Sequence, residues 1–229
     1  MTPEAIKHLL MSWAEPQFRA FSMSLMPGVN NVLGVRLPKL RKLARELALG
    51  DVDRYLQEAS DATFEEIMLQ GMVIGYAAKD LPKTLARIQT FVPKMDNWSV
   101  CDSFCGTLKF VEKNRSFFLR FLSPYFKSKE EYDVRFAIVI GLNYYIVPEY
   151  IDVLLQKLRW VKHKGYYAQM ALAWALSMAY IKFPQETEKF LMSENAFDDF
   201  VFNKTIQKIC ESRQVDIQEK MRLRSLIRK

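Results

Sequence analysis

The chain contains little glycine or proline, with eight glycines and nine prolines among 229 residues. An all-β protein of this length needs many tight turns, which these residues form, so the composition argues against that class. Leu, Ala, Lys, Glu, Met and Arg are abundant instead, and all of them favour helices. The composition therefore predicts an all-α protein.

Cysteine and histidine are also scarce. The three cysteines, Cys101, Cys105 and Cys210, are too few for a disulfide framework in a chain of this length. Cys101 and Cys105 lie one helical turn apart, but the two histidines, His8 and His163, are isolated, so no second ligand pair supports a zinc site. We therefore expect buried thiols in a reducing compartment, with no metal and no cofactor.

Targeting signals and long apolar runs are absent from the sequence. No apolar run approaches the roughly 20 residues that span a bilayer, and the start of the chain lacks the basic and apolar regions of a signal peptide. We expect a cytoplasmic protein with no membrane association. The motifs of the common nucleotide hydrolases and zinc hydrolases, a Gly-rich phosphate loop and a His-Glu-x-x-His pair, are missing as well.

Positive charge is in excess, with a formal net charge of +7 and a sequence pI of about 9.2. Such an excess favours a polyanionic partner. Several cations cluster on three segments that, at corresponding edges of a helical array, would neutralise the phosphates of a duplex backbone. These candidate phosphate-binding residues are Lys39, Lys42 and Arg45, then Lys162 and Lys164, then Lys204 and Lys208.

Helical periodicity runs through the whole sequence, with short connections and proline near several helix starts. The spacing of helix pairs is roughly 35 to 45 residues, within the range of HEAT and armadillo arrays. No motif repeats crisply, so this rhythm and the length are the basis for predicting one domain over residues 1–229. We expect a right-handed superhelical solenoid of antiparallel HEAT-like helix pairs with a concave binding face; a compact multi-helix bundle is the alternative. The predicted helices cover about residues 3–13, 15–25, 37–47, 62–78, 82–91, 97–109, 116–122, 130–143, 148–158, 165–181, 185–192, 198–211 and 217–228.

Two aromatic residues and two charged residues are the candidates for chemistry. Trp98 and Asp102 are four residues apart, so the indole and the carboxylate lie on the same helix face. A carboxylate beside an aromatic wall stabilises positive charge where water is partly excluded, which suits cleavage of a glycosidic bond. Arg135 is the only cation in an apolar helical run and needs an acceptor, such as phosphate, or a path to solvent, while Trp174 lies among small residues that leave room for a ring in a groove. For each of them the simpler interpretation is structural: a surface charge, or a core aromatic.

These residues, with their order and separation, resemble the AlkD-like family of DNA alkylation repair proteins, which are HEAT-like-repeat DNA glycosylases. The resemblance covers nearly the whole chain. It rests on Leu33-Gly34-Val35-Arg36-Leu37-Pro38-x-Leu40-Arg41, Asn97-Trp98-x-x-x-Asp102, Val134-Arg135-x-Ala137-Ile138 and Ala173-Trp174-Ala175-Leu176.

The resemblance implies a monomer that excises positively charged N3- or N7-alkylated purines from duplex DNA without flipping the base into a pocket. Trp98 and Trp174 would then be aromatic walls against the deoxyribose, Asp102 the carboxylate that stabilises the oxocarbenium-like centre and positions water, and Arg135 the phosphate ligand. The chain departs from the family pattern one turn after Trp174, where Ser177 and Met178 stand in place of a basic residue. Two alternatives therefore stay open: a DNA-binding paralogue without excision, and a helical-repeat scaffold for another protein.

Overall fold

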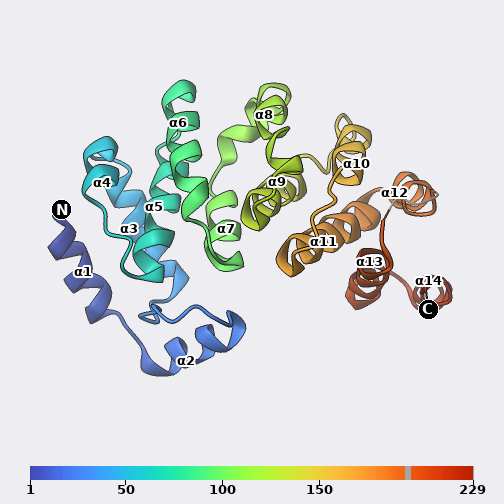
Figure 1. Cartoon of the computed structure of the whole chain (residues 1–229), viewed down its shortest axis with the longest axis horizontal. Coiled ribbons are helices and arrows are strands. Elements are labelled where there is room, and N and C mark those ends of the chain that lie inside the picture. Colours follow the sequence, from blue (N-terminus) through green and yellow to red (C-terminus); the bar gives the residue numbers. More distant parts are fainter. Residues whose placement is uncertain (194–196, 229) are drawn as a thin grey trace. The chain divides into compact units, whose positions relative to one another are not determined.

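In the computed structural model, which describes residues 1–193 and 197–228, fourteen α-helices and three short 3-10 helices account for all the regular secondary structure of the described residues. The all-α prediction is confirmed. The chain divides into two compact units, residues Met1–Phe110 and Val111–Lys229. Figure 1 shows the helices coloured along the sequence. The single domain over residues 1–229 and its superhelical course stay predictions.

In the first unit, α5 packs against α3 on one side and α7 on the other, so these three helices form one row. Helix α6 packs on α5 and completes a helix pair (Figure 1). Helix α5 is buried along almost its whole length, whereas α2 has no buried residue. The helices of this unit are α1 (Pro3–Ser12), α2 (Pro16–Leu25), α3 (Leu37–Leu47), α4 (Val52–Glu58), α5 (Phe64–Tyr76), α6 (Leu81–Phe91), η1 (Val92–Lys94) and α7 (Trp98–Cys105); η2 (Lys109–Lys113) contains the boundary between the units.

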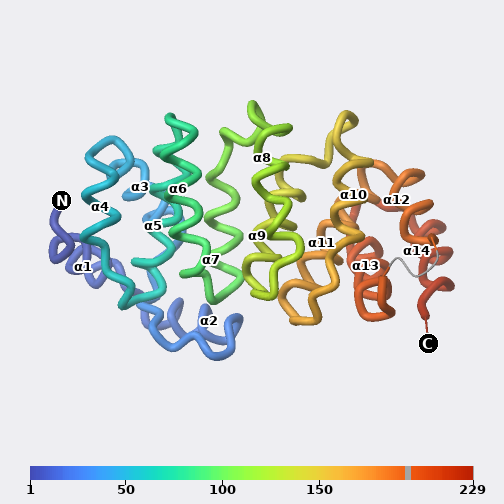
Figure 2. The backbone as a smooth tube through the Cα atoms, turned by 45° about the horizontal axis from the view of Figure 1, so that its top comes forward, coloured from blue at the N-terminus to red at the C-terminus, as the bar shows by residue number. Residues whose placement is uncertain are grey.

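The second unit repeats this arrangement. Helix α11 packs against α9 and α13. Helices α10 and α12 pack on each other and on α11, and Figure 2 traces the backbone through these helices. The buried face of α9 and α11 is nearly continuous, which fits the central position of these two helices. The helices are α8 (Arg115–Leu122), η3 (Tyr125–Lys127), α9 (Glu131–Tyr144), α10 (Ile151–Arg159), α11 (Tyr166–Lys182), α12 (Pro184–Leu191), α13 (Asp199–Glu211) and α14 (Ile217–Arg224).

The helix starts follow from local chemistry. Proline occupies one of the first two positions in α1, α2, α3, α6 and α12, where its missing N–H costs nothing. At seven helices, two of which (α1 and α6) also begin with proline, the side chain at the cap position accepts a hydrogen bond from an N–H group of the first turn. At α5, Thr63 and Glu66 form a reciprocal capping box. The capping residues are Thr2, Asp51, Thr63, Asp80, Asn97, Asp198 and Asp216.

The repeat is shorter and more regular than the sequence rhythm indicates. From α5 onward, the odd-numbered helices begin at residues 64, 98, 131, 166 and 199, which are 33 to 35 residues apart. Ion pairs and hydrogen bonds between neighbouring repeats recur at a separation of 34 residues, as in Arg87 with Asp53 and Lys164 with Asp198. From α5 to α13, the helix pairs therefore have nearly the same length.

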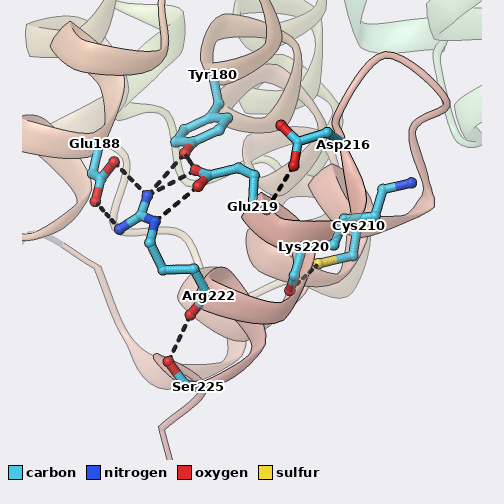
Figure 3. Close-up of polar contacts among 8 residues, drawn as sticks. All are labelled: Tyr180, Glu188, Cys210, Asp216, Glu219, Lys220, Arg222 and Ser225. Carbon is cyan, nitrogen blue, oxygen red and sulfur yellow. Dashed lines mark hydrogen bonds and ion pairs between the residues drawn. The ribbon is translucent and has the colours of Figure 1, made fainter.

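The last helix is held by a charged cluster. Arg222 on α14 contacts both carboxylate oxygens of Glu188 on α12, at 2.7 and 2.8 Å, and both oxygens of Glu219, at 2.7 and 2.8 Å. Tyr180 on α11 donates its hydroxyl hydrogen to Glu219. Figure 3 shows these side chains converging from three helices. The cluster ties α14 to the rest of the second unit.

Candidate active site

Helix α7 presents the proposed catalytic pair. Asn97 caps the helix by accepting a hydrogen bond from the Val100 N–H at 2.9 Å, which places Trp98 at the first helical position. Asp102 follows one turn later, and both side chains are half-buried. The predicted common face is confirmed for this pair, because both residues line one cleft within the first unit.

This cleft has a volume of about 260 Å³ and lies among α2, α3, α5 and α7. Its lining is mainly apolar, and Asp102 is one of its two carboxylates. A charge in such surroundings is weakly screened, so Asp102 acts more strongly on a nearby cation than it would in water. The apolar lining includes Phe18, Phe21, Leu25, Leu40, Phe64 and Met68.

The indole of Trp98 is oriented by a backbone contact. Its Nε1–H donates to the carbonyl oxygen of Leu25 at 3.1 Å, which joins the start of α7 to the end of α2. Because α2 has no buried residue of its own, this bond and the buried Met26 that follows the helix are important to its position. The sequence carries no signal for this bond, since its acceptor is a main-chain carbonyl.

The second carboxylate of the cleft is Glu65, a residue that the sequence reasoning missed. Its side chain is only 1% exposed and accepts hydrogen bonds from the N–H groups of Leu33, Gly34 and Val35 at 2.9, 2.7 and 3.1 Å. Gly34 has a φ of +90°, and a Cβ there would lie 2.7 Å from the Glu15 carbonyl. Glu65 therefore holds the loop before α3 in place, and its lone pairs are used in doing so.

Arg135 and Trp174 lie in the second unit, on the adjacent helices α9 and α11. Arg135 is 6% exposed, and its Nη1 donates to the Tyr167 carbonyl oxygen at 2.8 Å, so it has found a main-chain acceptor. Trp174 is half-buried among Ala171, Ala173 and Ala175, which are buried. The structure thus brings together Trp98 with Asp102 in one unit, and the helices of Arg135 and Trp174 in the other.

A family profile described as "DNA alkylation repair enzyme" matches residues 6–209 of the chain. The chain belongs to the DNA alkylation repair enzyme family. Among curated proteins, no sequence is similar enough to count as a match. The family places the chain in DNA repair, with DNA as the partner, and the matched range contains Trp98, Asp102, Arg135 and Trp174.

The predicted phosphate ligands of this DNA repair protein differ in how they are engaged. On α3, Lys42 and Arg45 are exposed, Arg45 lies 5.0 Å from the ring centre of Tyr76, and Lys39 lies 3.9 Å from a carboxylate oxygen of Glu15. Contacts of this length at the surface are weak, so these three cations are accessible to a phosphate backbone.

The cations of the second unit are more mixed. Lys162 is exposed, whereas Lys164 donates to Asp198 at 2.7 Å. Burial raises the pKa of the Asp198 carboxyl, but hydrogen bonds from Lys164, the Val201 N–H and Gln169 outweigh it, and the net pKa lies below its usual value. Asp198 therefore stays charged and offsets Lys164. Lys204 donates to Gln207 at 2.8 Å, and Lys208 is half-buried.

Helix length and ligand clusters bear on whether the chain could span a membrane or hold a metal ion. None of the described helices is long and apolar enough to cross a membrane. Residues 1–193 and 197–228 contain no cluster of three or more His, Cys, Asp or Glu side chains that could hold a metal ion. Cys101 and Cys105 are buried in α7, and Cys210 is half-buried with its Sγ 3.7 Å from the Lys220 carbonyl oxygen.

Proposed function

We propose that this repair-family protein is a DNA glycosylase that removes N3- or N7-alkylated purines from duplex DNA by hydrolysing the N-glycosidic bond. The observation that carries the proposal is the cleft that Trp98 and Asp102 both line, with an aromatic wall and a carboxylate in mainly apolar surroundings. This is the local chemistry that a cationic sugar centre requires.

The reaction needs only one carboxylate. Alkylation at N3 or N7 gives the purine a positive charge, so the C1′–N bond breaks with its electron pair going to the base, which leaves neutral. The deoxyribose is then an oxocarbenium-like cation that Asp102 stabilises. Water adds to C1′, its proton passes to Asp102 or solvent, and the products are the free base and an abasic site. Ordinary glycosidases need a second carboxyl group as an acid, because their leaving group carries no positive charge and its oxygen must be protonated as the bond breaks.

We assign the remaining roles by the family resemblance. Trp98 packs against the deoxyribose, and Trp174 supplies the second aromatic wall. Arg135 holds a phosphate near the lesion. The position of Arg135 and Trp174 on adjacent helices supports their acting as a pair. The accessible cations on α3, with Lys162, Lys164, Lys204 and Lys208, bind the phosphates of the flanking duplex, and the protein acts as a monomer without a cofactor.

A base-release assay on methylated duplex DNA tests this function. We expect the protein to release 7-methylguanine or 3-methyladenine, leaving abasic sites that alkali cleaves. Salt-dependent duplex binding without any release would replace excision by a sensing or shielding role. Negligible binding to duplex DNA and to heparin at physiological salt would instead point to a scaffold for another protein.

A further inference from the structure

One aromatic position recurs along the chain with a constant spacing. Phe64, Trp98, Tyr132, Tyr166 and Phe200 are separated by 34 residues each. Every one of them is the first or second residue of an odd-numbered helix, from α5 to α13. The spacing equals the repeat length of the helix pairs, so the five rings occupy equivalent places in successive repeats. The sequence therefore contains a repeat that is visible only once the helix starts are known.

The two members in the first unit both line the cleft beside Asp102. Phe64 is buried in its wall, and Trp98 is half-buried. In the proposed function Trp98 is the ring against the deoxyribose, so this position of the repeat is already a nucleotide-facing one in α7.

The members in the second unit form a continuous row with Tyr167. Tyr132 and Tyr167 are stacked with their ring centres 5.9 Å apart, and Tyr167 meets Tyr166 edge-on at 5.3 Å. Tyr166 in turn lies 6.2 Å from Phe200. The row crosses α9, α11 and α13 at their N-terminal ends. We call these four residues the aromatic row.

The outer half of the aromatic row is open to solvent. Tyr166 is 57% exposed and Phe200 is 37% exposed, although large aromatic residues usually bury most of their surface. A purely structural row would pack its rings inward. The exposed ring surface is available to a partner with a flat face.

The main chain of Tyr167, in the middle of the aromatic row, is held by two hydrogen bonds. The Tyr167 N–H donates to a Glu131 carboxylate oxygen at 2.5 Å, and its carbonyl accepts from Arg135 at 2.8 Å. Gly165 allows this approach, because a Cβ there would lie 2.5 Å from the Glu131 carboxylate. A residue whose main chain is already fixed loses less conformational entropy when a ligand binds.

Charges beside the row are largely matched within the chain. Asp198 pairs with Lys164 at 2.7 Å, and Asp199 pairs with Arg228 at 3.2 Å. Lys129 and Lys162, which are exposed, flank the row in sequence. Binding here must therefore depend more on ring contact than on charge.

We propose that the aromatic row binds unpaired DNA nucleotides, with bases stacking on Tyr166 and Phe200. Bases inside a duplex already have both faces covered by their neighbours, whereas an unpaired base offers a face of its own. DNA is the partner that the family supplies, and the repeat position is the one that Trp98 occupies. The proposal uses this DNA partner but does not depend on the excision step.

Binding of a fluorescently labelled oligothymidylate, followed by anisotropy at several salt concentrations, tests the proposal. Each ring that is removed takes away one stacking contact with a base, so we expect roughly tenfold or greater weakening in the double variant Tyr166→Ala/Phe200→Ala. Tyr166→Phe should bind like wild type, because stacking does not use the hydroxyl group. Phe117→Ala, which removes a ring that is 40% exposed on α8, is the matched control and should leave binding unchanged.

Two outcomes would overturn the aromatic row as a DNA contact. One is an absence of oligothymidylate binding by the wild type, and the other is equal binding by the double variant. The test is separate from the glycosylase proposal, because it measures binding of an oligonucleotide that contains no alkylated purine to excise. A protein that binds through the row but releases no base would leave this inference standing and remove excision.

Discussion

Trp98 is placed in the cleft by the hydrogen bond from its indole N–H to the Leu25 carbonyl oxygen. The same bond secures α2, a helix without buried residues. One side chain therefore forms the aromatic wall and also holds α2, a helix that lines the same cleft as Asp102. A hydrogen bond of this kind contributes about 1 kcal/mol net, which matters for an element with so few other anchors.

We predict that Trp98→Phe, which keeps a ring but removes the N–H, will loosen α2. Amide hydrogens of residues 16–25 should exchange several-fold faster, while those of α7 change little. Hydrogen–deuterium exchange followed by mass spectrometry measures this. Trp160→Phe in the second unit is the control, and unchanged exchange in α2 would contradict the anchoring role.

Gly75 allows α5 to approach the end of α7. A Cβ added at Gly75 would overlap the Thr107 side chain, because it would lie only 2.5 Å from the Cβ of Thr107. We predict that Gly75→Ala lowers the free energy of unfolding by about 1–3 kcal/mol, because overpacking must move backbone. Gly50→Ala, where the nearest atom is 3.6 Å away, should change it little. Chemical denaturation measures both variants, and equal stability would show that the two helices do not meet so closely.

Some residues of the candidate site could be predicted from the sequence, and others could not. The pair Trp98 and Asp102 was predictable, because a spacing of four residues places two side chains on one helix face. The supporting contacts were not, since Leu25 and Tyr167 act through main-chain carbonyls that any residue possesses. Glu65 was equally hidden, because nothing in an acidic residue of a first helical turn tells which loop it will hold.

The helix α14 depends on ionised groups at its contact with α11 and α12. Hydrogen bonds from Arg222 and Tyr180 lower the pKa of Glu219 from 4.5 to about 2. A carboxyl group whose pKa is depressed on folding stabilises the folded state above its unfolded pKa, and this contribution is lost as the pH falls towards the folded value. The contact should therefore weaken from about pH 4.5 downward (Figure 3).

We predict that amide protection in α14 falls between pH 5 and pH 3 while protection in α11 is retained. The loss should be about 1 kcal/mol, because Arg222 is 45% exposed and solvent screens the pair. The variant Glu219→Gln, which mimics the protonated group, should have weak protection in α14 at every pH. Glu211→Gln serves as control, and a pH dependence that survives in Glu219→Gln would rule out this carboxyl group as the cause.

Helices were predictable to within a few residues wherever the apolar period covered several turns. The predicted helix 37–47 has the observed bounds of α3. Helix α4 was missed, because its seven residues bury only Val52 and carry no apolar stripe. The repeat of 34 residues was also missed. Only one aromatic residue marks each repeat, and it is recognised as a marker only when the helix starts are known.

For the molecule as a whole, the net charge of +7 bears on DNA affinity. Each phosphate contact that is lost reduces the slope of log K against log salt by about 0.9 for duplex DNA. We predict that replacing Lys39, Lys42 and Arg45 together by glutamine weakens duplex binding. The slope of log K against log salt should become shallower by up to about 0.9 for each residue replaced. Fluorescence anisotropy over a salt series measures it.

The matched control removes three charges elsewhere in the same unit. Lys79, Lys83 and Lys109 are exposed and belong to none of the predicted phosphate-binding clusters. Replacing them by glutamine lowers the net charge equally, so it separates a specific surface from a general attraction. Equal slopes for the two triple variants would show that α3 is no DNA-binding surface.

The most direct test of the proposed function compares single-turnover release of 7-methylguanine from duplex DNA by wild type and Asp102→Asn. Asp96→Asn, an exposed carboxylate just before α7, is the control for charge, and circular dichroism checks that all three proteins are folded. Loss of a group that stabilises a developing charge typically costs about 100-fold or more in rate. We predict such a loss for Asp102→Asn and near-normal release by Asp96→Asn. Equal rates for Asp102→Asn and wild type would contradict the role of Asp102.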